Sequence, residues 1–261
     1  MPLTNGGDAT LYWELEGDSA APPLVLLNSI GTDMHLWDST LPILRKHFKL
    51  LRIDTRGHGA SSAPARDYTL ASLAQDVAAA MDAASIASAR IAGVSLGGMI
   101  AMQLALDAPS RVTALALVCT SATMDRGAWA DRVELVRAKG MESIADLVMG
   151  RFLSPAFVAE RPEVAATVRR ELLIMSADGY AGCGAAIRDM QLLDRLGATT
   201  CRTLVVTGAR DTSTPLEGHG EHLLAAIAGA RHVSLDAAHL APLEAPEALA
   251  TAFVQHFVDQ I

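Results

Sequence analysis

The chain has 261 residues, of which 51% are hydrophobic and 19% are charged. This composition supports a large buried core and excludes wholesale disorder. The formal net charge is −8 and there is no basic run, which argues against a nucleic-acid partner or an anionic membrane surface. The three cysteines form no Cys-x-x-Cys pair, no apolar run is long enough to span a bilayer, and the N-terminus lacks a signal pattern. We therefore expect a cytoplasmic protein without a disulfide scaffold.

Short apolar runs alternate with helical patterns, and this order predicts an α/β fold with a mostly parallel central sheet flanked by helices. The strands are expected at Leu11–Leu15, Leu24–Leu27, Leu50–Ile53, Arg90–Ala92, Ala114–Val118, Leu204–Val206 and His232–Leu235. The helices of this core are expected at Leu41–Phe48, Thr69–Ala84, Leu96–Leu106 and Pro246–Val258, with Thr69 as an N-cap.

The segment 124–193 departs from this alternation, because it contains helical patterns and no strand pattern. Its helices are expected at Trp129–Lys139, Met141–Arg151, Glu163–Met175 and Ala185–Leu193. Strand pattern resumes at Leu204, so the segment is an insertion and not a second sequential domain. We therefore predict a core formed by residues 1–123 and 194–261, with a helical lid at 124–193.

The chemistry is indicated by the sequence Gly93-Val94-Ser95-Leu96-Gly97, which lies between a predicted strand and a predicted helix. This is the context of a nucleophile elbow, in which a sharp strand-to-helix turn needs small residues two positions either side of the serine. The turn lifts the Ser95 hydroxyl above the sheet edge. It also leaves the Leu96 N–H at a helix N-terminus, where it can stabilise an anion. A chance glycine-rich turn is the alternative.

A nucleophilic serine needs a base, and the base needs an orienting acid. Downstream of Ser95, Asp211 follows one predicted strand and His239 follows the next, in the order Ser, Asp, His. Asp236 is the rival acid, but it lies three residues before His239 in the same loop and cannot easily reach the far ring nitrogen. We predict Ser95, Asp211 and His239 as a catalytic triad, with a cap or turn role as the alternative for either aspartate.

A second oxyanion donor is expected in the polar loop that follows the strand Leu24–Leu27. The end of that strand makes the Ile30 N–H the donor, with Asn28 and Ser29 shaping the loop. His58 follows another strand and is interpreted as a loop-structuring residue near the site. His219 and His222 have no carboxylate or thiol to complete a ligand set, so no metal site is expected.

Together these residues resemble the α/β-hydrolase superfamily over essentially the whole chain, and within it the 3-oxoadipate enol-lactone hydrolases. The motifs that carry the resemblance are Asn28–Asp33 with Trp37, Asp54–Gly59, Gly93–Met99, Asp211 with Pro215, and His239 with Glu244. The resemblance implies an α/β-hydrolase fold with an inserted helical cap and a cofactor-independent hydrolase. In it Ser95 attacks a lactone carbonyl, while the Ile30 and Leu96 amides hold the oxyanion. The chain departs from the family in the lid, where an Arg-Trp pair reads Arg151-Phe152.

The resemblance makes a small lactone or ester the expected substrate, with an enol-lactone of a keto-dicarboxylic acid from aromatic-acid catabolism as first choice. Candidate substrate contacts are Asn28, Trp37 and, in the lid, Arg126 and Arg132, which flank Trp129 and could clamp a carboxylate. A broader carboxylesterase, a C–C bond hydrolase, a cofactor-free perhydrolase and a ligand receptor on the same fold are the alternatives. The sequence does not indicate an oligomeric state.

Overall fold

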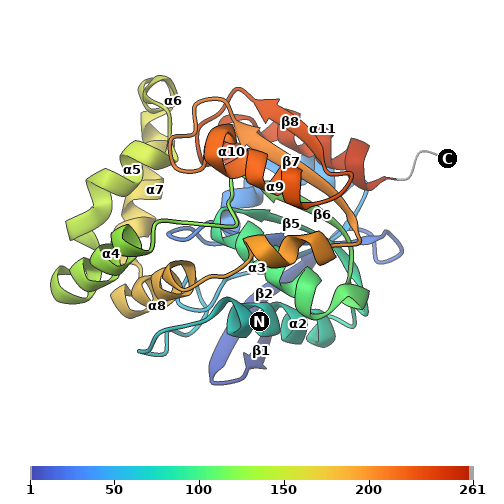
Figure 1. The fold of residues 1–261 in the computed structure, drawn as a ribbon, viewed down its shortest axis with the longest axis horizontal. Helices are drawn as coiled ribbons and strands as arrows, with labels where there is room; N and C mark the ends of the chain where they lie inside the picture. The colour runs from blue at the N-terminus through green and yellow to red at the C-terminus, as the bar shows by residue number, and fades with distance from the viewer. Residues whose placement is uncertain (1, 259–261) are drawn as a thin grey trace.

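The computed structural model describes residues 2–258, which are built around an eight-stranded sheet (Figure 1). The strands lie in the order β1-β2-β4-β3-β5-β6-β7-β8. Strand β2 is antiparallel to its neighbours β1 and β4, and every other pairing in the sheet is parallel. The strands are Leu3–Gly6 (β1), Ala9–Glu16 (β2), Pro23–Leu27 (β3), Lys49–Ile53 (β4), Ala89–Val94 (β5), Val112–Val118 (β6), Arg202–Gly208 (β7) and Arg231–Leu235 (β8).

Helices cover both faces of this sheet. Helices α2 (Leu70–Ala83) and α3 (Leu96–Asp107) pack on one another on one face (Figure 1). On the other face, α11 (Pro246–Phe257) packs with α1 (Leu41–Leu44) and with the 3₁₀ segment that precedes α1. Ring contacts fix the second layer, with centroids 6.1 Å apart for Trp37 and Phe253 and for Phe48 and Phe257. The core helices are Leu41–Leu44 (α1), Leu70–Ala83 (α2), Leu96–Asp107 (α3), Glu221–Ala226 (α9), Ala241–Glu244 (α10) and Pro246–Phe257 (α11).

The helical insertion lies between β6 and β7 and gathers at one side of the sheet (Figure 1). Its helices are Arg126–Lys139 (α4), Ala145–Phe152 (α5), Pro155–Glu160 (α6), Pro162–Ile174 (α7) and Ala177–Arg188 (α8). Shorter helical turns are Met34–Thr40 (η1), Pro109–Arg111 (η2), Met141–Ile144 (η3), Leu193–Ala198 (η4) and Leu216–Gly220 (η5). The predicted α/β architecture with an inserted helical segment is confirmed.

Local sequence explains most of these elements. Strand β3 (Pro23–Leu27) is an apolar run whose last four residues are buried, as expected for a strand covered on both faces. Thr69 is the N-cap of α2, as predicted, and forms a reciprocal capping box with Ser72: the Ser72 N–H donates to Thr69 Oγ1 at 3.1 Å, and the Thr69 N–H to Ser72 Oγ at 3.2 Å.

The predicted helix Leu41–Phe48 is shorter in the structure. Its last turn is closed by i→i+3 bonds, from Lys46 N–H to Ile43 O and from His47 N–H to Leu44 O, so α1 ends at Leu44. Within residues 2–258 we find no helix with the length and hydropathy that crossing a bilayer requires. All three cysteines are free thiols.

Candidate active site

Ser95 occupies the turn between β5 and α3 in a strained backbone conformation. Its φ of 53° and ψ of −115° lie in a region that residues with a side chain rarely adopt. The turn is possible only with glycines beside it, because a Cβ on Gly93 would lie 2.2 Å from the Gly97 carbonyl carbon. The Ser95 N–H donates to Val118 O at 2.9 Å, and the Thr120 hydroxyl donates to Ser95 O at 2.6 Å. These bonds hold the strained residue in place.

His239 and Asp211 form a buried pair at the ends of neighbouring strands. His239 Nδ1 lies 3.0 Å from Asp211 Oδ2, and both side chains are almost fully buried. Asp211 also accepts hydrogen bonds from the Ser213 N–H at 2.8 Å and the Thr214 hydroxyl at 2.8 Å. Burial raises the pKa of Asp211, but the charge and hydrogen bond of His239 and these donors outweigh it and lower the pKa to about 2. Asp211 is therefore an ionised acceptor that orients the imidazole through Nδ1–H.

Two other groups compete for these roles. Asp236, the rival acid, is exposed and pairs with Arg210 at 3.0 Å, away from the ring of His239. His219 Nδ1 lies 2.8 Å from Ser121 Oγ, which is a Ser–His contact outside the predicted triad. Ser121 is fully buried and donates its own hydroxyl hydrogen to Thr123 O at 2.6 Å. Its oxygen is therefore not directed at a substrate.

The loop after β3 places Ile30, the expected oxyanion donor, at the cavity of Ser95. Ile30 is buried and lines the same cavity as Ser95, and the Leu96 N–H begins α3 beside it. Among the backbone hydrogen bonds of residues 2–258, none has the Ile30 or Leu96 N–H as its donor. His58 fixes the next peptide, because its Nε2 accepts the Gly31 N–H at 3.0 Å. Two buried N–H groups are thus free beside Ser95, which is the arrangement that stabilises a developing oxyanion.

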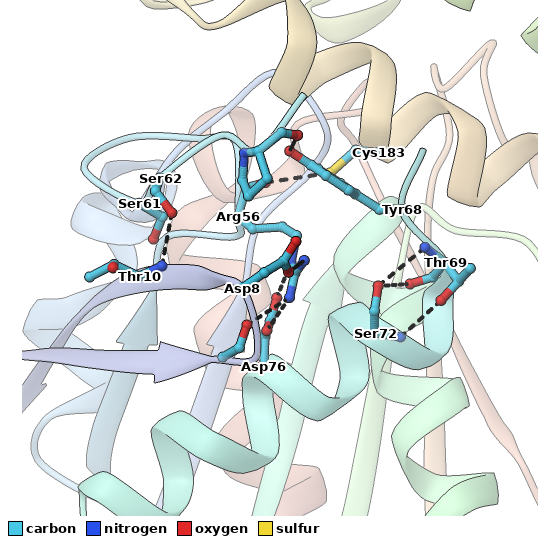
Figure 2. A network of polar contacts seen from close by, with 12 residues as sticks. Asp8, Thr10, Arg56, Ser61, Ser62, Tyr68, Thr69, Ser72, Asp76 and Cys183 are labelled. Atoms are coloured by element: carbon cyan, nitrogen blue, oxygen red, sulfur yellow. Dashed lines mark hydrogen bonds and ion pairs between the residues drawn. The ribbon is translucent and has the colours of Figure 1, made fainter. Parts of the chain in front are cut away.

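The loop that carries His58 is held by a buried arginine (Figure 2). Arg56 is 2% exposed and makes a bidentate contact to Asp76 of α2, at 2.5 and 2.7 Å. It also contacts Asp8 at 2.9 Å and stacks on Tyr68, with its guanidinium carbon 5.3 Å from the ring centroid. This network ties the N-terminal hairpin and α2 to the loop. The predicted loop-structuring role of His58 is thus supported by its hydrogen bond to Gly31 and by the Arg56 network that holds its own loop.

Ser95 and His239 open into a small cavity of about 30 Å³ beneath the insertion. Two arginines of the insertion, Arg132 and Arg151, line it, and neither is among the ion pairs of the described residues. Arg132 stacks on Trp129, with its guanidinium carbon 4.4 Å from the ring centroid. Burial and the charge of Arg132 lower the pKa of Arg151. The cavity is therefore lined by two arginines without carboxylate partners, of which Arg132 is half-buried and Arg151 is exposed.

A polar group without an acceptor faces the same space. Tyr180 is 1% exposed and lines the cavity, and no described residue accepts a hydrogen bond from its hydroxyl. Burial raises the pKa of this phenol more than the charge and hydrogen bond of Arg132 and the charge of Arg151 lower it, so the phenol is neutral and can donate a hydrogen bond. A buried hydroxyl of this kind normally has an acceptor, which a bound anion can supply.

A larger, outer cavity of about 490 Å³ adjoins the inner one. Its lining includes the apolar side chains of Leu135, Ile144 and Leu147 and the carboxylates of Asp125 and Asp131. The residues that line both cavities are Met124, Trp129, Arg132, Arg151 and Ser213. A ligand at Ser95 that is larger than one or two water molecules must extend towards this outer space.

The structure separates the predicted substrate contacts into two groups. Trp129 and Arg132 line both cavities, whereas Arg126 is 78% exposed and pairs with Asp189 at 3.1 Å. Asn28 and Trp37 are fully buried and bond to each other, from Trp37 Nε1 to Asn28 Oδ1 at 3.1 Å. These last two support the loop after β3 and do not line the cavity.

Several cavity residues carry too weak a sequence signal to be predicted as part of the site. Arg151 stands out in the sequence only as part of a departure from the family pattern, although its place in a helical lid could have suggested a second cation. Tyr180 lies in a glycine- and alanine-rich stretch that carries no chemical signal. Phe152 stacks on the His239 ring, with centroids 6.1 Å apart and planes at 14°, and only the fold brings these two together.

Comparison with known proteins places this geometry among hydrolases. A family described as "alpha/beta hydrolase fold" matches residues 22–246. A "3-oxoadipate enol-lactonase 2" of Acinetobacter baylyi is 31% identical over 242 residues, which cover 92% of this chain and 90% of the relative. The crystal structure of the enol-lactonase from Burkholderia xenovorans LB400 is similar with a TM-score of 0.95 and 34% identity, over 99% of this chain and 100% of that one. A hydrolase from Pseudomonas aeruginosa has a TM-score of 0.93 and 40% identity, over 98% of each chain.

Proposed function

Because this chain belongs to the alpha/beta hydrolase family, we propose that it is a serine hydrolase that opens a small lactone or ester bearing a carboxylate. The single observation that carries this proposal is the strained Ser95 in a cavity shared with the buried His239–Asp211 pair. Its first-choice substrate is 3-oxoadipate enol-lactone, which is opened to 3-oxoadipate.

In the proposed reaction Ser95 Oγ attacks the lactone carbonyl and its proton passes to His239. Since Asp211 occupies Nδ1, Nε2 is the nitrogen available for this transfer. The Ile30 and Leu96 N–H groups stabilise the tetrahedral oxyanion, and a single donor of this kind contributes about 2.7–4 kcal/mol. The intermediate collapses as the C–O bond of the ring breaks, and His239 returns the proton to the released enol oxygen. Water then attacks the acyl-serine carbonyl while His239 takes its proton, and His239 returns that proton to Ser95 Oγ as the acyl C–O bond breaks. The released enol tautomerises to the 3-oxo acid.

The charge of the cavity supports an anionic substrate. Arg132 and Arg151 lack carboxylate partners among residues 2–258, and the Tyr180 hydroxyl lacks an acceptor there. A substrate carboxylate would accept hydrogen bonds from these groups and compensate one of the two positive charges. We propose that the insertion acts as a lid that contributes these three groups, while the core supplies Ser95 and His239. The two enol-lactonase relatives support the same substrate class.

The proposal is tested with purified protein and 3-oxoadipate enol-lactone, by following the loss of its ultraviolet absorbance. We expect turnover that Ser95→Ala abolishes while the circular dichroism spectrum is unchanged. Absence of acceleration over the spontaneous rate refutes the enol-lactone as substrate. Turnover retained in Ser95→Ala refutes the mechanism.

Charge recognition is tested with Arg132→Gln and Arg151→Gln. A lost hydrogen bond to a charged group is worth about 1.5–3 kcal/mol, so we expect kcat/KM for the enol-lactone to fall about 10–150-fold in each variant. The matched control is Arg126→Gln, a charge removed from the same insertion outside the cavity, which should leave kcat/KM unchanged. An equal loss for all three variants would contradict the proposed clamp.

A broader carboxylesterase is the second candidate, and the outer cavity of about 490 Å³ with its apolar wall favours it. A thermophilic esterase from Thermogutta terrifontis is 26% identical to this chain, with a TM-score of 0.89 over 95% of this chain and 92% of that one. Neutral p-nitrophenyl esters separate the two candidates. A higher kcat/KM for a neutral ester than for the enol-lactone, unaffected by Arg132→Gln, would favour the esterase.

A further inference from the structure

We propose that Glu244 is a positioning residue that joins the helical insertion to the loop carrying His239 and thereby holds the imidazole in place. The inference rests on the proposed function, because it assigns Glu244 a part in the reaction of Ser95. Glu244 ends α10, and it touches neither Ser95 nor the cavity. Its effect is therefore exerted through the backbone on either side of His239.

Glu244 bonds to both partners with one carboxylate. Its Oε1 accepts the Ser154 N–H at 2.5 Å, and its Oε2 accepts the Ser154 hydroxyl at 3.0 Å. The same Oε2 accepts the Ala238 N–H at 3.1 Å. Ser154 belongs to the insertion, where it is the N-cap of α6, and Ala238 immediately precedes His239. One side chain thus links two segments that are far apart in the sequence.

A second set of contacts closes the link on the other side of His239. The Leu240 N–H donates to Phe152 O at 3.0 Å, and the Phe152 ring stacks on the His239 ring. The neighbours of His239 are therefore both bonded, directly or through Glu244, to the short segment Phe152–Ser154. Displacement of that segment would pull on both peptides that flank the imidazole.

The environment of Glu244 indicates that its carboxylate is held mainly by hydrogen bonds and not by an ion pair. Its side chain is 1% exposed, and the nearest cation, Arg210, is 3.9 Å away and partly exposed. Arg210 makes its shorter contact, at 3.0 Å, with the exposed Asp236. The burial of Glu244 is therefore compensated mainly by the two N–H groups and one hydroxyl from the segments that it joins. Burial of a carboxylate costs free energy unless both of its oxygens accept hydrogen bonds.

This pattern of donors makes Glu244→Gln an informative change. Glutamine has nearly the same shape, but one of its two terminal groups is a donor. In either amide orientation that NH₂ group faces a backbone N–H, of Ser154 or of Ala238. The variant therefore breaks one side of the link without leaving a hole, and Glu244→Asp keeps the acceptors on a shorter side chain.

The test compares kcat and KM of Glu244→Gln, Glu244→Asp and the wild type, with active sites counted by fluorophosphonate labelling. We expect Glu244→Gln to lower kcat about 10–100-fold, as small displacements of a catalytic group do, with a smaller change in KM. Glu244→Asp should recover part of the loss. The matched control is Asp236→Asn, which removes a carboxylate from the same loop and also faces Arg210, and should behave as the wild type.

Hydrogen exchange supplies a readout that does not depend on turnover. We expect faster exchange of the Ala238 and Leu240 amides, and of Ser154 in the insertion, in Glu244→Gln only. Unchanged kcat, or a lowered melting temperature with kcat and these amides unchanged, would overturn the inference and leave Glu244 a structural residue. If the wild type fails to hydrolyse esters and lactones, the proposed function fails. If the wild type is inactive, unchanged exchange of these amides in Glu244→Gln would still show that Glu244 does not join the insertion to the His239 loop.

Discussion

The buried imidazole of His58 makes the stability of the protein depend on pH. His58 is 1% exposed; its Nε2 accepts the Gly31 N–H, and its Nδ1 lies 3.2 Å from Arg56 O, to which it donates. Both ring nitrogens of the neutral form are used. A second ring proton would point at the Gly31 N–H, and burial lowers the pKa of His58 from 6.5 to about 4.

The sign follows from the two pKa values. Between pH 6.5 and about 4 the unfolded chain binds a proton that the folded protein does not, so stability present at neutral pH is lost as the pH falls. Each pKa unit corresponds to about 1.36 kcal/mol. Lowering the pH from 7 to 5 therefore removes about 2 kcal/mol of folding free energy through His58 alone.

The assay is urea unfolding of the wild type and His58→Gln at pH 7 and pH 5, followed by tryptophan fluorescence. Glutamine does not titrate, and its Oε1 can accept the Gly31 N–H, so we expect the loss between the two pH values to be smaller by about 2 kcal/mol. Contributions of other groups cancel in the comparison. The exposed His47→Gln is the control and should lose as much stability as the wild type. The same loss in His58→Gln as in the wild type would refute the reasoning.

Three further changes have defined outcomes. Gly93→Ala places a Cβ 2.2 Å from the Gly97 carbonyl carbon, so it should cost about 1–3 kcal/mol or more in thermal melts and abolish fluorophosphonate labelling. Asp76→Asn removes the charge that faces buried Arg56 and should lower the free energy of unfolding by about 3–5 kcal/mol in urea; a loss below about 1 kcal/mol would contradict this. Asp211→Asn should leave the fold intact but favour the wrong imidazole tautomer, with kcat on an activated ester falling about 10⁴-fold; a fall of less than tenfold would exclude its orienting role.

The parts of the fold that the sequence predicts are those in which local pattern and burial agree. Strands such as β3 and β6 are continuous apolar runs, and both are buried in the sheet as expected. The sequence does not predict strand β1, because Leu-Thr-Asn-Gly is a short polar stretch at the edge of the sheet, where pairing with β2 alone defines it. Edge strands of this kind carry little hydrophobic signal.

Helix α8 shows how tertiary contacts override local propensity. The sequence predicts a helix that starts at Ala185, whereas α8 starts at Ala177, because glycines obscure its first turns. The structure gives the reason for two of them. A Cβ on Gly179 would lie 2.4 Å from Gly57 O, and a Cβ on Gly182 would lie 2.6 Å from the Tyr68 ring. These glycines let the insertion pack closely on the loop that carries His58.

The candidate site likewise contains residues that the sequence predicts and residues that only the folded structure reveals. Ser95, Asp211 and His239 follow strand ends in a recognisable order, so their spacing along the chain is enough to select them. Glu244 stands out in the sequence only as part of a family motif and Arg151 only as a departure from one. Neither signal indicates a role, because their surroundings are created by the insertion folding over the core. The sequence pattern therefore identifies the residues that react more readily than those that bind the substrate or position a reacting side chain.

A nucleophilic Ser95 that is activated by His239 reacts with a fluorophosphonate, and this reaction can be followed by peptide mass spectrometry together with turnover. We expect one probe per chain, on the peptide that contains Ser95, with loss of labelling in His239→Gln and multiple turnovers on an activated ester. A single slow turnover would instead support a ligand receptor on this fold. Labelling elsewhere, or none with a folded protein, would contradict the account.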